Sequence, residues 1–149
     1  MELFFHSRSD LSEFQGNLRI VQWKPEVHPV PLIRPDTPSD ARGVSAYGTV
    51  LRDEAGHFRF WYQATPAGWD FRHDVSAVAC ARSVDGWHWT KPPLGADGGH
   101  LCNLGLHSPS VFIDPAAPAN RRYVAIGCGK PGLGARGRRY GYHAAFSAD

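Results

Sequence analysis

The residues of this chain that could do chemistry are its carboxylates, histidines, cysteines and aromatic side chains. The eight histidines show neither HxH nor HExxH spacing, and the nearest histidine–acid pair, His73-Asp74, is expected in a loop. The three cysteines lack CxxC spacing and leave one unpaired in any disulfide scheme, so reduced, structural thiols are expected. The sequence therefore predicts no metal site, and leaves carboxylates for acid–base chemistry and aromatic rings for stacking.

Motifs for phosphate-bearing cofactors and for serine nucleophiles are also missing. Residues 127–130, GCGK, lack the rest of a GxxxxGK[ST] loop, and residues 132–137 match GxGxxG by letter but lie between strands with no helix. No GxSxG elbow occurs. We therefore expect no cofactor.

The charge and hydropathy of the chain exclude further classes of protein. A formal net charge of +2 is too small to indicate a nucleic-acid partner, and the basic cluster 136–139 is expected in a solvated hairpin loop, with an anion contact as the alternative. The N-terminus lacks the basic start and the long apolar core of a signal peptide, and no apolar segment is long enough to span a membrane. A cytoplasmic location is the expectation.

The elements that must position the chemical residues are short strands. Sixteen Gly and twelve Pro, with few helix-favouring segments, indicate an all-β chain. A Pro-rich connection over residues 25–43 is expected to pack against a sheet, with a flexible linker as the alternative. Strands are predicted at residues 17–24, 46–52, 58–64, 75–83, 87–90, 109–113, 121–127 and 139–147.

These strands recur with a period of about 60 residues. Asp53 and Asp114, each in a hairpin turn, are 61 residues apart, and Asp85 and Asp149 are 64 apart. A repeat made only of strands predicts propeller blades of four antiparallel strands. The expected organisation is a lead-in at 1–44, a first blade at 45–95 and a second blade at 96–149 that lacks its fourth strand. We therefore expect part of a longer protein, with open sheet edges that could cause self-association.

The turn after the third strand, residues 83–89 (SVDGWHW), has a structural interpretation. Asp85 can accept hydrogen bonds from backbone N–H groups of its own turn, Gly86 can supply the positive φ, and Trp89 can pack between sheets. Catalysis by Asp85 is the alternative. We favour the structural role.

Three segments together carry a family resemblance. Residues 58–62 end in Trp-Tyr, residues 85–95 follow the pattern DGxxWxKPxLG, and residues 107–114 read HSPSVFID. Over about residues 28–149 the chain resembles bacterial proteins related to five-bladed propeller glycoside hydrolases, the superfamily of arabinanases, invertases and levansucrases. The resemblance implies a partial five-bladed β-propeller and a carbohydrate partner.

In that superfamily sugar binds at one mouth of the central channel, where carboxylates near the starts of the innermost strands do the chemistry. Glycoside hydrolysis needs one carboxylate as base or nucleophile and one carboxylic acid at the leaving oxygen. The resemblance makes Asp40 the candidate base or nucleophile, with a capping or loop role as the alternative. His107 could bind a sugar hydroxyl or orient an acid, unless it is a hydrogen-bonded histidine at a strand start. The remaining candidate sugar contacts are Arg42, Tyr47, Asn103 and Trp69, with Trp87 as a further stacking candidate and Trp61 and Trp89 as core residues.

The sequence departs from the family in its carboxylates. The first inner strand, near residues 46–50, contains no acid, and no glutamate follows Glu54. We therefore expect these 149 residues alone to be inactive, as part of a protein that hydrolyses glycosidic bonds by carboxylate acid–base chemistry. The competing hypotheses are a non-catalytic propeller that binds glycan or protein, and a truncated reading frame without a function.

Overall fold

A computed structural model describes residues 24–70, 77–94, 98–102, 104–129 and 141–148. The chain divides into two compact units, residues 1–30 and 31–149, and every described strand belongs to the second unit. The described residues are all-β apart from one short 3₁₀ turn, and all strand pairs are antiparallel, which confirms the predicted fold class at that level. The predicted strand at 17–24, apart from Lys24, and the basic cluster 136–139 lie outside the described residues.

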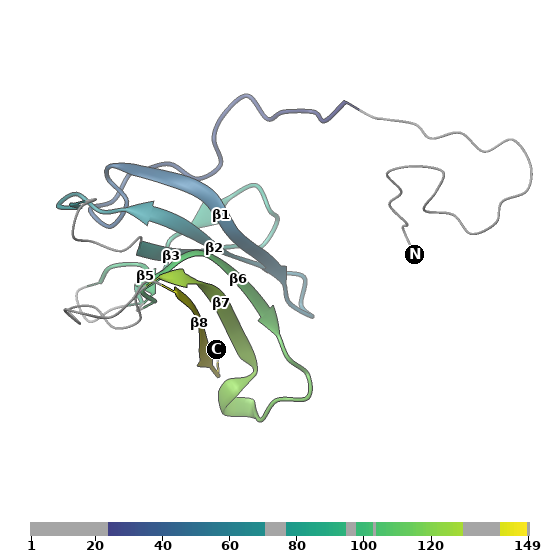
Figure 1. The fold of residues 1–149 in the computed structure, drawn as a ribbon. Helices are drawn as coiled ribbons and strands as arrows, with labels where there is room; N and C mark the ends of the chain where they lie inside the picture. The colour runs from purple at the N-terminus through teal and green to yellow at the C-terminus, as the bar shows by residue number, and fades with distance from the viewer. Residues whose placement is uncertain (1–23, 71–76, 95–97, 103, 130–140, 149) are drawn as a thin grey trace, which may run out of the picture. The chain divides into compact units, whose positions relative to one another are not determined.

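Sheet A contains the first five strands of the chain (Figure 1). Its order is β1–β2–β3–β4, and β5 also pairs with β3. No strand was predicted where β5 lies, because a two-residue strand leaves no periodic pattern in the sequence. The bounds are β1 Gly43–Arg52, β2 Phe58–Thr65, β3 Ala77–Ser83, β4 Trp89–Thr90 and β5 Leu101–Cys102.

Sheet B follows in sequence and has the order β6–β7–β8. A 3₁₀ turn, η2 (Ala119–Arg121), lies in the loop between its first two strands. Figure 1 shows β6 running beside β1, so the first strands of the two sheets are neighbours. The bounds are β6 Leu106–Ile113, β7 Tyr123–Gly129 and β8 Gly141–Ser147.

The first hairpin of each sheet turns on an aspartate, as the 61-residue repeat predicts. Asp53 Oδ1 accepts a hydrogen bond from the His57 backbone N–H at 2.8 Å. Asp114 Oδ1 accepts one from the Ala116 N–H at 2.9 Å. Gly56 takes the positive φ of 88° that the first of these turns requires. Both carboxylates therefore stabilise the hairpin turns in which the sequence placed them.

The main core lies between the two sheets. Trp61, Val78 and Cys80 of sheet A are buried together with three residues of sheet B, Leu106, Val111 and Ala125. Neighbouring positions along β2 point to the opposite face, where Tyr62 and Ala64 are buried with Ala79 and Ala81. Sheet A is thus buried on both faces, whereas sheet B uses one face against sheet A.

Irregularities at the same place in β1 and β6 join the sheets. The register of β1 against β2 shifts between Ser45 and Thr49, and that of β6 against β7 shifts between His107 and Ser110. Thr49 Oγ1 accepts a hydrogen bond from the Val111 N–H at 2.9 Å. Gln63 Oε1 accepts one from the Ser108 N–H at 3.1 Å. These bonds hold β6 against β1 and β2 of sheet A.

The turn between β3 and β4 confirms the structural role predicted for Asp85. Asp85 Oδ1 accepts hydrogen bonds from the Trp87 and His88 N–H groups, both at 2.8 Å, and Oδ2 lies 2.6 Å from His88 Nδ1. The histidine contact, followed by the backbone bonds, holds the pKa of Asp85 well below its usual range. Gly86 has φ +79°, and its carbonyl accepts a hydrogen bond from Trp89 Nε1 at 2.9 Å.

Candidate functional site

Tyr47 and His107 meet at the register shifts of β1 and β6. β1 begins at Gly43, earlier than the predicted residue 46, so Tyr47 lies in the middle of the strand rather than at its start. Their ring centroids are 6.1 Å apart with an edge-on interplanar angle of 63°. The Tyr47 side chain is 61 % exposed, and His107 is half-buried. Gly48 permits this bulge, because a Cβ atom there would lie 1.8 Å from the Trp61 carbonyl oxygen. The result is an exposed aromatic ring beside an imidazole, at the register shifts of two neighbouring strands.

Arg42 and Trp69 also come together, at the end of sheet A where β1 starts. The Arg42 N–H donates to the Thr65 carbonyl at 3.0 Å, and Arg42 Nη1 donates to the Trp69 carbonyl at 2.7 Å. The Trp69 N–H in turn donates to the Pro66 carbonyl at 3.2 Å. Arg42 therefore holds the loop that follows β2 against the residue that precedes β1.

Asp40 lies in a buried polar cluster on the face of sheet A that points away from sheet B. Its Oδ1 accepts hydrogen bonds from the Thr37 N–H at 3.0 Å and the Thr37 hydroxyl at 2.8 Å. Its Oδ2 accepts from Lys91 Nζ at 2.6 Å and from the Tyr62 hydroxyl at 3.1 Å. Its side chain has no exposed surface.

Lys91 and His100 complete the cluster. Lys91 Nζ also donates to the Arg34 carbonyl at 2.5 Å and to Asp36 Oδ1. The Lys91 side chain is only 13 % exposed. His100 Nε2 lies 3.3 Å from Asp40 Oδ2, and the His100 ring stacks on Tyr62 with centroids 6.3 Å apart. The cluster therefore joins the Pro-rich connection to β2, to the segment after β4 that holds Lys91, and to the segment before β5 that holds His100.

Burial and contacts with neighbouring groups shift the pKa values of Asp40 and His100 in opposing directions. Burial alone would raise the pKa of Asp40, but hydrogen bonds from Lys91 and Thr37 outweigh it and hold that pKa below its ordinary value. Burial lowers the pKa of His100, although the Asp40 charge opposes that shift. Burial, with the adjacent Asp40 carboxylate, raises the pKa of Tyr62. At neutral pH Asp40 is thus ionised and His100 is neutral.

These contacts are those of a carboxylate that fastens a loop. Asp40 accepts four hydrogen bonds. Its Oδ2 is directed at Lys91 rather than at open space. The capping and loop role that the sequence left open for Asp40 accounts for every one of these contacts. The catalytic role stays a prediction.

Four of the predicted site residues lie together in the structure as two pairs. The residues that bind Asp40 were not predicted. Tyr47 meets His107, and Arg42 meets Trp69. Asn103 lies outside the described residues. The partners of Asp40 went unrecognised because Lys91 is 51 residues away and was noted only as part of the 85–95 pattern that carries the family resemblance. Trp87 is 58 % exposed, whereas Trp61 is buried and Trp89 half-buried, as expected of core residues.

The described residues hold no group of three or more His, Cys, Asp or Glu side chains that could bind a metal ion. Burial raises the pKa of Cys80, and raises that of Cys102 to about 12, so neither thiol is ionised at neutral pH. No helix within the described segments has the length and apolar character needed to cross a membrane.

No family model matches the chain. The curated proteins contain no significant match to it either.

Proposed function

We propose that this protein is a carbohydrate-active protein of the glycoside hydrolase-like, five-bladed propeller type, and that sheets A and B are two of its blades. The observation that carries the proposal is the exposed Tyr47 ring beside His107 at the register shifts of β1 and β6. An aromatic ring can cover the apolar face of a sugar ring, and an adjacent imidazole can hydrogen-bond its hydroxyls. This surface, formed by Tyr47 and His107, is the proposed sugar-contact surface.

Arg42 and Trp69 support this surface from the end of sheet A. The hydrogen bond from Arg42 to the Trp69 carbonyl orders the loop after β2. Trp69 is half-buried, so part of its ring remains open to a ligand. We assign these two residues the role of shaping the sugar site, with Asp40 positioning the segment that leads into β1.

Hydrolysis requires two carboxyl groups about 5 to 10 Å apart on either side of the scissile bond. In this chain the carboxylate proposed from the sequence, Asp40, is hydrogen-bonded to Lys91 and Tyr62. We therefore assign sugar binding to the 149 residues and reserve hydrolysis for a protein that supplies further carboxylates. The second candidate function is a non-catalytic glycan-binding module, which the buried pairing of Asp40 favours.

The test is sugar binding by the purified chain. Arabino-oligosaccharides, sucrose and levan oligosaccharides are titrated into it by calorimetry, with product formation followed in parallel. Tyr47→Ala should weaken binding about tenfold, the scale expected for loss of one stacked aromatic ring. Tyr142→Ala removes another exposed tyrosine, 86 % exposed on β8, and should leave binding unchanged. Equal affinities of the Tyr47→Ala variant and the unmodified chain, or no binding of any sugar, would overturn the proposal.

A further inference from the structure

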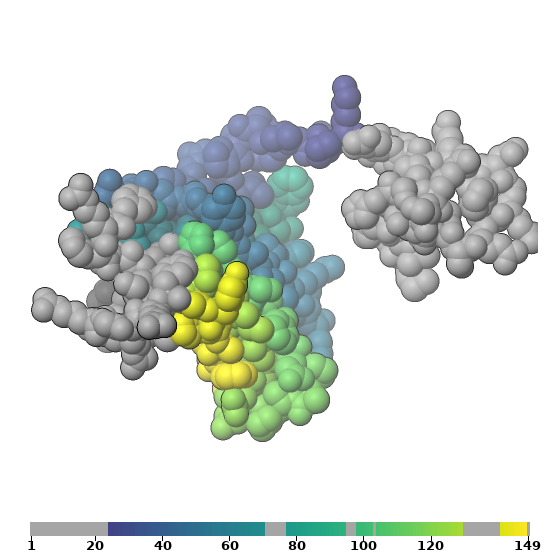
Figure 2. All heavy atoms as spheres, viewed as in Figure 1, coloured from purple at the N-terminus to yellow at the C-terminus, as the bar shows by residue number. Residues whose placement is uncertain are grey.

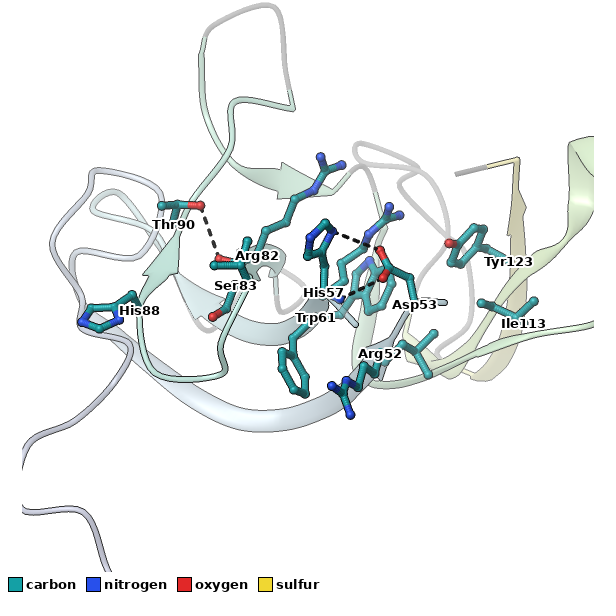
Figure 3. A pocket seen from close by; sticks show the side chains of 14 residues that line it. Arg52, Asp53, His57, Trp61, Arg82, Ser83, His88, Thr90, Ile113 and Tyr123 are labelled. Atoms are coloured by element: carbon teal, nitrogen blue, oxygen red, sulfur yellow. Dashed lines mark hydrogen bonds and ion pairs between the residues drawn. The ribbon is translucent and has the colours of Figure 1, made fainter. Parts of the chain in front are cut away.

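A second candidate site lies at the opposite ends of the same strands from Tyr47. A pocket of about 360 Å³ opens between the β1–β2 hairpin, the end of β3 and two residues of sheet B, Ile113 and Tyr123. Figure 3 shows Arg82 and Thr90 on one side of this pocket, Asp53 and His57 at the hairpin, and Ile113 and Tyr123 on the other side. Nothing in the proposed sugar-contact surface accounts for this pocket.

Two arginines line it from directly opposite positions. Arg59 of β2 and Arg82 of β3 are register partners, so their side chains leave the same face of sheet A. That face is the one toward sheet B, because the next pair on the same face, Trp61 and Cys80, is buried against sheet B. Like charges directly opposite each other in a sheet are destabilising. The sheet therefore carries an unfavourable charge pair within a pocket.

Neither charge is paired with a carboxylate in the described part of the chain. Among the described residues, neither Arg59 nor Arg82 has an acidic group within ion-pair distance. The Arg59 guanidinium lies over the rings of Trp61 and Tyr123, at 5.6 and 5.2 Å from their centroids. Asp53, the acid that lines the pocket, instead accepts the His57 N–H at 2.8 Å and lies 3.7 Å from His57 Nδ1.

Arg52, the third arginine of the pocket, differs from Arg59 and Arg82 because it already has a hydrogen-bond partner in its own hairpin. Arg52 Nε donates to the Gly56 carbonyl at 3.1 Å, and its guanidinium lies 5.2 Å from the Phe58 ring centroid. Arg52 is thus engaged within its own hairpin, whereas the hydrogen-bonding capacity of Arg59 and Arg82 is left for a ligand. The Arg82 side chain is exposed and Arg59 is half-buried, so one is accessible and the other is held by aromatic rings.

We propose that this pocket binds an oxyanion, most simply the phosphate group of a small molecule. Two guanidinium groups can each donate paired hydrogen bonds to the oxygens of one phosphate, which neutralises the opposed positive charges. The ring of Tyr123 offers a wall for the uncharged part of the ligand. The inference is independent of sugar binding, because it concerns different residues at the other ends of the strands.

The test is thermal unfolding of the full chain in increasing inorganic phosphate, against sodium chloride of equal ionic strength. A ligand that binds only the native state raises Tm with its concentration. Arg82→Gln should weaken phosphate binding about tenfold or more, the scale expected when a charged hydrogen-bond donor is lost. The same variant should have a higher Tm than the unmodified chain without phosphate, because the charge repulsion is gone.

Arg121→Gln is the matched control, since Arg121 is also an exposed arginine but lies over Phe146 and does not line this pocket. It should keep the full response to phosphate. A rise in Tm with acetate but not with phosphate would support the oxyanion site and identify a carboxylate as its ligand. Equal Tm values in phosphate and chloride with no effect of acetate, or an unchanged phosphate response in Arg82→Gln, would overturn the proposal.

Discussion

Asp40 and Lys91 form a buried ion pair that joins the loop before β1 to the segment after β4. Their Oδ2 and Nζ atoms are 2.6 Å apart, and their side chains are 0 % and 13 % exposed. A buried charge is strongly unfavourable unless it is paired and hydrogen-bonded. Tyr62 and Thr37 supply further hydrogen bonds to the same carboxylate. The pair therefore makes the position of the Pro-rich connection depend on the end of sheet A.

Removing the charge of Asp40 should destabilise the chain. Asp40→Asn leaves the Lys91 ammonium largely buried without its fully buried carboxylate partner, and we expect a loss of about 3 kcal/mol in the free energy of unfolding. Chemical denaturation followed by tryptophan fluorescence measures it. A carboxylate that serves only catalysis could be replaced without such a loss.

Asp36→Asn is the matched control for that experiment. Asp36 bonds the same lysine, but its side chain is 66 % exposed. An exposed ion pair contributes little, so the loss should stay below about 1 kcal/mol. If both variants unfolded at the same denaturant concentration, Asp40 would not have the structural role assigned to it.

His100 should make stability depend on pH. Its pKa is lowered by burial, so below the ordinary value of 6.5 the unfolded chain binds the proton more readily than the folded chain. Stability should therefore fall as the pH drops below 6.5 and stop falling once His100 is protonated in the folded state too. Asp40, whose pKa is also lowered, adds a second loss as the pH falls below 3.8.

The variant His100→Gln isolates the first of these losses. Unfolding free energies of the two chains are compared from pH 8 to pH 4, and their difference should change below pH 6.5. His57→Gln is a control, since the His57 side chain is 56 % exposed. A difference between His100→Gln and the unmodified chain that is constant over this range would contradict the assignment.

The strands were predictable from the sequence because local signals set them. The hairpin residues 53–57 and the aromatic run 58–62 locate β1 and β2 within a few residues, and the second repeat does the same for β6 and β7. Asp85 was predictable for the same reason, because all its partners lie within three residues.

The buried cluster around Asp40 was not predictable in this way. Its members Tyr62, Lys91 and His100 are distant in sequence, and each has an ordinary local explanation. Lys91 stands before two prolines that end a strand, and His100 follows two glycines. Only the sheet order brings them to one place, so a candidate carboxylate near a strand start could not be told apart from a structural one. The proximity of Tyr47 and His107 could be predicted, because the repeat places them at equivalent positions ahead of the turns at Asp53 and Asp114.

The open edge of sheet B should favour self-association of the 149-residue chain. In the described sheet, β8 pairs with β7 alone. Figure 2 shows β8, in yellow, at the surface on this face. Ala144→Lys places a charge on an exposed position of that strand and should reduce association measured by sedimentation velocity. Ala55→Lys, at an exposed position of the β1–β2 turn in sheet A, adds the same charge away from β8 and should have no effect. Equal association of the two variants would argue against pairing through β8.

Gly48 should be the residue of β1 that is least tolerant of a side chain. A Cβ atom there would lie 1.8 Å from the Trp61 carbonyl oxygen and 2.8 Å from the carbonyl carbon, so the strand must move away from β2. We expect Gly48→Ala to lower the free energy of unfolding by about 3 kcal/mol. Gly68→Ala, where a Cβ atom would meet nothing within 4 Å, should change it by less than about 1 kcal/mol. Because Gly48 lies beside Tyr47, the same shift should also weaken sugar binding in Gly48→Ala, measured by calorimetry at a temperature where the variant is folded. Equal stabilities of the two alanine variants would show that the close approach of β1 to Trp61 is not a constraint on this fold.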